Sequence, residues 1–211
     1  MIVEIFSDVV CPWCYIGKRR FESALERYDA TEAVRVHWKA YQLDPAAPTT
    51  PEPVFSAYAR KFGGAKQAEE IITRLNAVAA SEGIDMRLDR ALRTNTFDAH
   101  RVLWLAGLSD DAGLQGRLQE RLMKAYFTDG VDIARIDMLT SLACETGMDR
   151  SEVSALFESD RGKREVHAEI SRSADFDITG VPAFVFNERH MIPGAQDPDT
   201  FVRILERVAT R

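Results

Sequence analysis

Alternation of apolar and polar residues predicts β-strands near both ends of the chain. Residues 2–7 (IVEIFS) alternate, and residues 33–41 (AVRVHWKAY) alternate again, which is the period of half-buried strands. Near the other end, residues 183–186 and 190–193 have the pattern of a hairpin whose turn covers 187–189. A sheet built from these strands joins segments that are far apart in the sequence.

Helical spacing of apolar residues fills the rest of the chain. One helix is predicted over 12–28, between the first two strands, and an amphipathic helix over 197–208 follows the hairpin. The long middle region predicts further helices, at 54–62, 66–81, from about 95, at 112–127, at 135–146 and from 149 to about 173. The last of these opens with DRSE, a capping-box pattern of Asp149 and Glu152.

Residues 42–54 interrupt this pattern with Pro45, Pro48, Pro51 and Pro53, which predicts a stiff extended linker and a domain boundary. The order of elements is strand–helix–strand, then helices, then strand–strand–helix. This order is that of an α/β thioredoxin fold interrupted by an all-helical insertion. We expect residues 1–44 and 176–211 to form the thioredoxin-like domain and residues 45–175 to form the insertion domain.

Bulk composition excludes several classes of protein. The 211 residues can bury a sizeable core, and the net charge of -6 argues against a nucleic-acid or membrane partner that needs a basic surface. No apolar run approaches the ~18 residues that span a bilayer. The N-terminus (MIVEIFSD) lacks the basic region of a secretory signal. We therefore expect a cytoplasmic protein, in which thiols are mostly kept reduced.

Two of the three cysteines, Cys11 and Cys14, lie where the first strand meets the first helix. With Pro12 at the first helical position, Cys11 becomes the N-cap and Cys14 lies one turn further on, on the same face. Free backbone N–H groups and the helix dipole favour a thiolate at Cys11, to which Cys14 can donate a hydrogen bond. We predict that Cys11 is the exposed, attacking thiol and that Cys14 is the buried, resolving thiol.

Two other interpretations of the CxxC pair were weighed. A zinc site needs about four N or S ligands, but the remaining cysteine, Cys144, lies deep in the helical region and the four histidines are scattered, so no metal is predicted. A structural disulfide closing so short a loop stabilises little, since the gain grows with loop length. The βαβ context favours a redox dithiol.

Three stretches together resemble a known family. They are CPWC (11–14), TGVPAFVFNERHMIPGAQ (179–196) and NTFDAHRVLWLA (95–106), and with the helical insertion they are similar to the DsbA-like thioredoxin family, above all to its cytoplasmic FrnE-type branch. The resemblance implies a disulfide oxidoreductase or isomerase with Cys11, Cys14 and Pro182 at the catalytic positions. It also implies a cis bond before Pro182, although only about 5–6% of X-Pro bonds in folded proteins are cis.

The predicted substrate-binding residues surround this site. A cis bond leaves the backbone N–H and C=O of Val181 free to pair with a substrate peptide. Pro12 and Trp13 lie between the cysteines, and an exposed Trp13 suits an apolar substrate, although it can equally pack into a domain interface. Asn95 most simply caps a helix with Asp98 at its third position. The resemblance alternatively implies that Asn95 and His100 line a substrate groove.

Several roles stay open at this stage. Asp8 either holds the loop before Cys11 or accepts a proton from Cys14. Cys144 is predicted to be a buried apolar filler rather than a third exchanging thiol. The dipeptide Pro12-Trp13 lacks the histidine that periplasmic family members usually carry between the two cysteines. This difference predicts that the disulfide is a weaker oxidant.

The leading functional prediction is thiol–disulfide exchange on protein or peptide substrates, with no cofactor and with glutathione as a conceivable redox co-substrate. The competing hypothesis is glutathione-dependent isomerisation or transfer on small molecules, because 2-hydroxychromene-2-carboxylate isomerases and kappa-class glutathione transferases resemble the same architecture. Those relatives typically have serine at the first cysteine position. A chaperone-like or metal-binding module is the third, non-enzymatic alternative.

Overall fold

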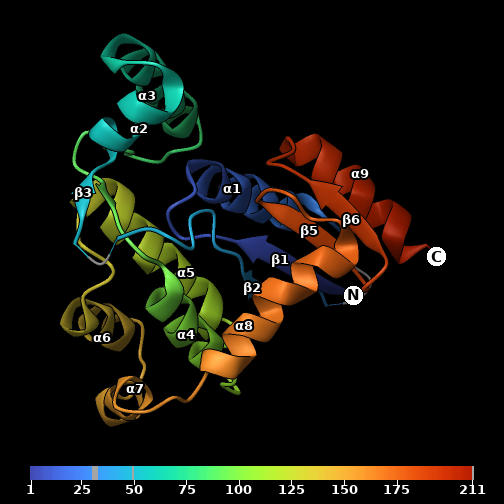
Figure 1. The fold of residues 1–211 in the computed structure, drawn as a ribbon. Helices are drawn as coiled ribbons and strands as arrows, with labels where there is room; N and C mark the ends of the chain where they lie inside the picture. The colour runs from blue at the N-terminus through green and yellow to red at the C-terminus, as the bar shows by residue number, and fades with distance from the viewer. Residues whose placement is uncertain (30–32, 49, 211) are drawn as a thin grey trace.

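A computed structural model describes residues 1–29, 33–48 and 50–210. Its main sheet has four strands, β1 (Ile2–Ser7), β2 (Arg35–Ala40), β5 (Ala183–Phe186) and β6 (His190–Pro193), in the order β2-β1-β5-β6 (Figure 1). β1 pairs with β2 in parallel and with β5 antiparallel, and β5 pairs antiparallel with β6. The predicted strands and hairpin are confirmed, and β1 is a central strand.

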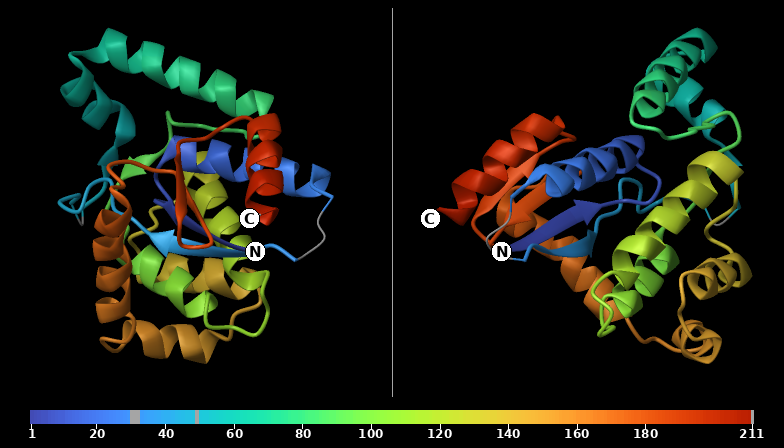
Figure 2. Two further views of the ribbon diagram at one scale, coloured as in Figure 1. Left: turned by 90° about the vertical axis from the view of Figure 1, so that its right-hand side faces the viewer. Right: turned by 180° about the vertical axis from the view of Figure 1, so that it is seen from behind.

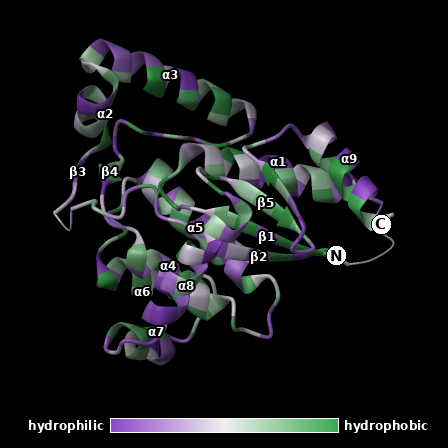
Figure 3. Cartoon of the chain, turned by 45° about the vertical axis from the view of Figure 1, so that its right-hand side comes forward, coloured by the Kyte–Doolittle hydropathy of each residue, from purple (hydrophilic) through white to green (hydrophobic). Residues whose placement is uncertain are grey.

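One face of the sheet is covered by α1 (Pro12–Arg27) and α9 (Pro198–Ala209), which pack against each other. Phe21 of α1, Phe184 of β5 and Phe201 of α9 meet there with ring centroids 4.6–5.2 Å apart. On the other face the carboxylate of Glu4 binds Arg172 through both oxygens. Figure 3 shows the strands as a hydrophobic layer between helices whose colours are mixed.

The region between β2 and β5 is predominantly helical, as predicted. Its elements are β3 (Glu52–Pro53), α2 (Val54–Phe62), α3 (Ala65–Ser81), β4 (Leu92–Arg93), α4 (Phe97–Ala106), α5 (Leu114–Lys124), the π-helical turn η1 (Ala125–Asp129), α6 (Ile136–Glu145), α7 (Arg150–Phe157), α8 (Lys163–Arg172) and the 3₁₀ turn η2 (Ser173–Phe176). α4, α5 and α8 pack against β2, and α3 lies beside α1 (Figure 2). The α/β thioredoxin fold with a helical insertion is thereby confirmed.

The domain boundaries after residues 44 and 175 stay predictions. The predicted ranges also include residues 30–32, 49 and 211, which lie outside the described residues. Within the described part of the 42–54 linker, Glu52 and Pro53 form β3, which pairs with β4 in a small second sheet that the sequence did not predict.

Two helix predictions need correction. The stretch predicted to be helical from 149 to 173 is broken between α7 and α8, where Gly162 adopts a left-handed conformation with φ 81° and lies so close to Trp104 that a Cβ there would be 2.8 Å from its ring. The helix predicted over 112–127 ends at Lys124 and continues as the π-turn η1. Asp149 caps α7 as predicted, since its side chain accepts from Glu152 N.

No helix within the described ranges is long and apolar enough to cross a membrane.

Candidate functional site

The N-terminus of α1 holds the dithiol. Cys11 is the N-cap residue, in an extended conformation (φ -88°, ψ 115°), and Pro12 begins the helix, as predicted. The backbone N–H of Cys11 donates to Asp8 O (3.0 Å), and its carbonyl accepts from Cys14 N (3.0 Å), so the loop and the first turn are fixed by local hydrogen bonds. Both cysteines are free thiols.

Cys11 is only 4% exposed, which corrects the prediction of an exposed nucleophile. Cys11 is buried because a segment distant in the sequence covers it. The loop before β5 lies against Cys11, whose Sγ donates to the carbonyl of Val181 at 3.5 Å. That carbonyl therefore already accepts one hydrogen bond in this state, and the pairing of Val181 with a substrate strand stays a prediction.

Cys14 is 1% exposed behind Cys11, as predicted. Burial raises the pKa of Cys14 well above its usual range, and the hydrogen bond and charge interaction with Cys11 raise it further. The backbone N–H of Asp8 and the hydroxyl of Ser7 oppose this rise in pKa by donating to the sulfur. Ser7 is itself held by Gln119, whose Nε2 donates to Oγ at 3.1 Å. Cys14 thus stays protonated, and its S–H group donates a hydrogen bond to the sulfur of Cys11.

The Val181-Pro182 bond is cis, which confirms what the family resemblance implied. Pro182 is buried against α1, and its carbonyl accepts from Gly194 N at 2.8 Å. The contact with α1 is close because Gly17 has no side chain: a Cβ there would lie 3.0 Å from Pro182 Cγ. Cys11, Cys14, Val181 and Pro182 therefore come together as the sequence predicted.

Pro12 and Trp13 have different surroundings. Trp13 is 42% exposed, so it is available to a partner and is not wedged into an interface. Pro12 is buried and lines a cavity of about 540 Å³ together with Leu43, Tyr58 and Tyr126. Three cationic side chains, Arg60, Lys61 and Arg93, also line this cavity. A small molecule or a substrate side chain can enter it beside the dithiol.

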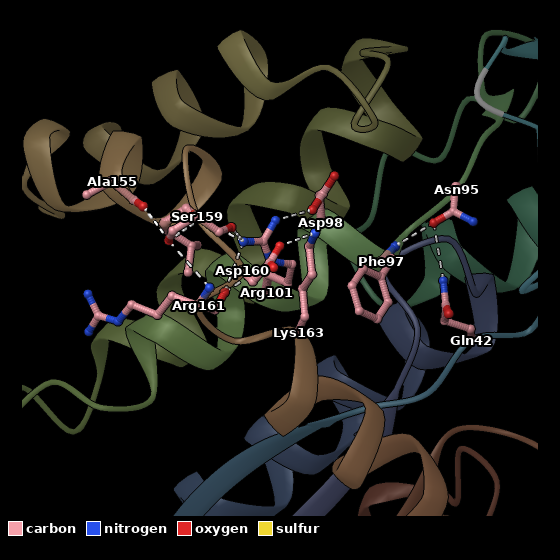
Figure 4. A network of polar contacts seen from close by, with 11 residues as sticks. Gln42, Asn95, Phe97, Asp98, Arg101, Ala155, Ser159, Asp160, Arg161 and Lys163 are labelled. Carbon is pink, nitrogen blue, oxygen red and sulfur yellow. Dashed lines mark hydrogen bonds and ion pairs between the residues drawn. The ribbon is translucent and has the colours of Figure 1, made fainter.

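Asn95 does not cap α4 in the predicted way. The N-cap residue is Thr96, and Asn95 Oδ1 accepts from Phe97 N at 2.9 Å and from Gln42 Nε2 at 3.4 Å (Figure 4). Asp98 is the second helical residue and binds Arg101 rather than completing a capping box. The side chain of Asn95 is thus used to fix the loop before α4 against residue 42.

His100 lies beneath the dithiol loop. It is 3% exposed, and its Nε2 is 3.4 Å from Asp8 Oδ1, while Asp8 Oδ2 accepts from Leu43 N at 2.8 Å. Asp8 therefore holds the loop before Cys11 against the segment after β2, which supports the first of its two alternatives. His100 contacts Asp8 rather than the lining of the cavity.

Sequence reasoning missed Tyr58 and Tyr126. Tyr58 lies on α2 and Tyr126 lies in the π-turn η1, and neither carries a sequence signal that distinguishes it from an ordinary core aromatic. Cys144, predicted to be buried, is half-buried on α6. Across the described parts of the chain, no group of three or more His, Cys, Asp or Glu side chains is placed to hold a metal ion.

The family model described as "DSBA-like thioredoxin domain" matches residues 2–206. A probable DsbA oxidoreductase from Streptomyces coelicolor, SCO1869, is 33% identical, with 100% of this chain and 91% of that chain covered and a TM-score of 0.92.

Two more distant solved structures share the fold. The cytosolic disulfide reductase DsbM from Pseudomonas aeruginosa, solved with GSH, is 17% identical with a TM-score of 0.66, and 100% of both chains is covered. A 2-hydroxychromene-2-carboxylate isomerase is 15% identical with a TM-score of 0.69, covering 99% of this chain and 96% of that chain. At these identities the likeness shows the fold alone.

Proposed function

Because the chain belongs to the DSBA-like thioredoxin domain family, we propose that it is a thiol–disulfide oxidoreductase and isomerase that acts on protein or peptide disulfides through Cys11 and Cys14. The family supports an oxidoreductase or isomerase role in general. The choice of protein or peptide substrates rests on the exposed Trp13 beside the dithiol, which offers an apolar contact to a polypeptide.

In the proposed mechanism, the Cys11 thiolate attacks one sulfur of the substrate disulfide. A new S–S bond forms, the substrate bond breaks, and its second sulfur leaves as a thiolate. Cys14 then loses its proton and attacks the Cys11 sulfur, which releases the remaining substrate thiolate and leaves a Cys11–Cys14 disulfide. Two electrons pass to the substrate. In reshuffling, a different substrate thiolate attacks the mixed disulfide, forms a new substrate S–S bond and releases Cys11 as a thiolate.

The observation that carries the proposal is the buried Cys14 thiol behind Cys11 at the N-terminus of α1. Cys14 lies within hydrogen-bonding reach of Cys11, and its high pKa keeps the resolving thiol protonated until a mixed disulfide has formed. Pro182 holds the loop that lies over the sulfur. A single structural cysteine needs none of these features.

We extend the proposal to the redox environment. Without a histidine between the cysteines, the disulfide is a weaker oxidant, which favours reduction or reshuffling in the cytoplasm, as in the FrnE-type branch. The likeness to a cytosolic reductase solved with GSH is compatible with glutathione as the thiol that regenerates the dithiol, at two equivalents per disulfide. The protein itself needs no cofactor in this scheme.

Insulin-disulfide reduction and recovery of scrambled ribonuclease test the proposal in the parent and in Cys11→Ser and Cys14→Ser. We expect Cys11→Ser to lose both activities, and Cys14→Ser to lose net reduction while it keeps some reshuffling. Full activity of Cys11→Ser contradicts the mechanism. Isomerisation of a small aromatic substrate that survives in Cys11→Ser supports the competing isomerase hypothesis instead.

A further inference from the structure

The cavity beside Pro12 contains two tyrosines for which the exchange mechanism above has no use. Tyr126 is 3% exposed and Tyr58 is half-buried, and both line the cavity. Neither hydroxyl forms a hydrogen bond with any residue that the structure describes. Neither hydroxyl is among the buried polar atoms that are shut off from a partner, so both are accessible from the cavity and can donate to a molecule bound there.

Tyr126 lies in an uncommon type of backbone turn. α5 gives way at Ala125 to the π-helical turn η1, and Gly130 ends this turn with φ 70°. π-helical turns are rare and occur frequently at functional sites. The neighbouring Phe127 stacks on Tyr15 with ring centroids 5.9 Å apart and so anchors η1 against α1, and its ring also meets the ring of Tyr126 edge-on at 4.8 Å. Phe127 therefore supports Tyr126, which lines the cavity.

The pKa values of both tyrosines are raised by their surroundings. Burial and the charge of Cys11 raise the pKa of Tyr58 to about 12, and burial, with Tyr58 and Asp8, raises the pKa of Tyr126. Both hydroxyls are therefore neutral donors at neutral pH. Two of the three cations that line the cavity are paired with carboxylates, because Arg60 binds Glu52 and Arg93 binds Glu52 and Asp44, while the ammonium of Lys61 lies over the ring of Phe62.

We propose that the hydroxyls of Tyr58 and Tyr126 donate hydrogen bonds to the sulfur that leaves when Cys11 attacks a substrate disulfide. This inference rests on the proposed function and adds catalytic residues to it. As the Cys11 thiolate forms the new S–S bond, the electron pair of the broken bond stays on the leaving sulfur, inside the cavity. The two hydroxyls stabilise this developing thiolate and keep their own protons, and solvent protonates the product thiolate after release.

The two hydroxyls should affect the exchange rate differently for different leaving thiols. A hydrogen bond to the leaving sulfur matters most when that sulfur is strongly basic and matters little when the leaving thiolate is already stable. The exchange rate falls as the leaving thiol becomes more basic. We therefore expect this dependence on the basicity of the leaving thiol to become steeper when the hydroxyls are removed. A loss of packing instead slows all disulfides by one common factor.

The experiment uses the full chain, reduced, as parent, Tyr58→Phe, Tyr126→Phe and the double variant. Tyr28→Phe, at the end of α1 and outside the cavity lining, is the matched control. The rate of the first exchange step is measured with a series of small disulfides, from nitro-aromatic to alkyl. We expect each single variant to lose about tenfold with alkyl disulfides, the size of one hydrogen bond to a charged group, and far less with nitro-aromatic ones. Alkylation of Cys11 by iodoacetamide, which releases no thiolate, should stay at the parent rate.

The outcomes separate this inference from the proposed function. A parent that exchanges with these disulfides while the double variant shows the parent's dependence on leaving-group basicity overturns the role of the tyrosines alone. A uniform loss over all disulfides also overturns it, because that result reports altered packing. A parent that exchanges with none of the disulfides contradicts the proposed function and this inference together.

Discussion

Gly17 sets how closely α1 approaches the loop that carries Pro182. A Cβ at this position would lie 3.0 Å from Pro182 Cγ and 3.3 Å from Ala195 Cβ, so both neighbours must move if Gly17 is replaced by alanine. We expect Gly17→Ala to slow insulin reduction several-fold by displacing Pro182 from Cys11. Its thermal stability should change little, because alanine favours a helix by about 1 kcal/mol over glycine and offsets the contact.

The control for this prediction is Gly116→Ala on α5, where an added Cβ meets only Trp38 Nε1, at an ordinary 3.7 Å. Both variants replace a helical glycine with alanine and so gain the same helix propensity. Only Gly17→Ala adds a Cβ that lies close to Pro182. Equal reduction rates in the two variants would show that the fit between α1 and the Pro182 loop does not limit exchange.

The buried thiol of Cys14 predicts a pH dependence of stability. Burial raises the pKa of Cys14, so the folded protein keeps a proton that the unfolded chain releases above about pH 8.5. This stabilising contribution is complete below that pH and is lost as the pH rises through the folded pKa. In a reduced Cys11→Ser background, we expect the free energy of unfolding to fall more steeply between about pH 8 and 10 than in Cys11→Ser/Cys14→Ser.

Urea unfolding at each pH measures the difference between the two variants. The Cys11→Ser background removes the second thiol, so only Cys14 distinguishes the pair. Parallel curves across this pH range would mean that Cys14 ionises as readily in the folded protein as in the unfolded chain.

At the residue scale, local geometry could be predicted and long-range geometry could not. Cys11 at the N-cap, Pro12 at the first helical position and Cys14 one turn on all follow from the spacing of neighbouring residues. The burial of Cys11 depends on Val181, which lies 170 positions away, and no local pattern records that contact. The same limit hid Tyr58 from sequence reasoning.

Among the elements, the hairpin strands β5 and β6 were predicted best. Their bounds match the prediction because a short apolar run, AFVF, and the turn residues that follow it mark the hairpin. The break between α7 and α8 was missed, although residues 158–165 (ESDRGKRE) interrupt the apolar spacing and include Gly162, which turns the backbone. The π-turn η1 was missed because one extra residue in a helical turn leaves the apolar pattern nearly unchanged.

Arg101 of α4 joins α7 to the segment before α8. Its guanidinium is 3% exposed and donates to the carbonyls of Leu156, Ser159 and Arg161 at 2.6–3.2 Å (Figure 4). The last carbonyls of a helix lack partners within it, so Arg101 satisfies groups that α7 leaves open. A planar fork can reach several carbonyls at once, whereas a lysine ammonium cannot.

We therefore expect Arg101→Lys to lower the free energy of unfolding by about 3 kcal/mol, since at least two charge-assisted hydrogen bonds are lost. Urea unfolding at neutral pH measures it. Arg164→Lys, at a side chain that is 92% exposed, is the control and should change stability by less than about 0.5 kcal/mol. A similar small change in both variants would show that solvent satisfies these carbonyls equally well.

At the scale of the whole molecule, the helical region completes the sheet. β2 lies at the edge of the sheet, where its outer backbone groups have no neighbouring strand. Gln115 of α5 accepts from Trp38 N (2.9 Å) and donates to Trp38 O (3.0 Å), and Glu169 of α8 accepts from Ala40 N (3.0 Å). Side chains of the inserted helices thus occupy the edge that would otherwise be free to pair with another chain.

Glu120 of α5 ties the helical region to α1, directly behind the dithiol. It accepts from the Tyr15 hydroxyl at 2.7 Å, lies 2.8 Å from Lys18 Nζ and binds Arg19. Burial by itself raises the pKa of Glu120, but the charge and hydrogen bond of Lys18, with Tyr15 and Arg19, outweigh it and hold the pKa below its usual value. The ionised carboxylate therefore stabilises the contact between the two parts of the molecule.

Replacing Glu120 with glutamine tests this contact through its pH dependence. A carboxyl whose pKa is lowered by folding contributes stability above its unfolded pKa of about 4.3, and this contribution is lost as the pH falls through the folded pKa. We expect Glu120→Gln to be about 2 kcal/mol less stable than the parent at pH 7, with the gap closing below about pH 4. Urea unfolding from pH 7 to pH 3 measures the gap, with Glu145→Gln, a 49% exposed partner of Arg121, as the control. A gap that stays constant on acidification would mean that the shape of the side chain, rather than its charge, holds α1 to α5.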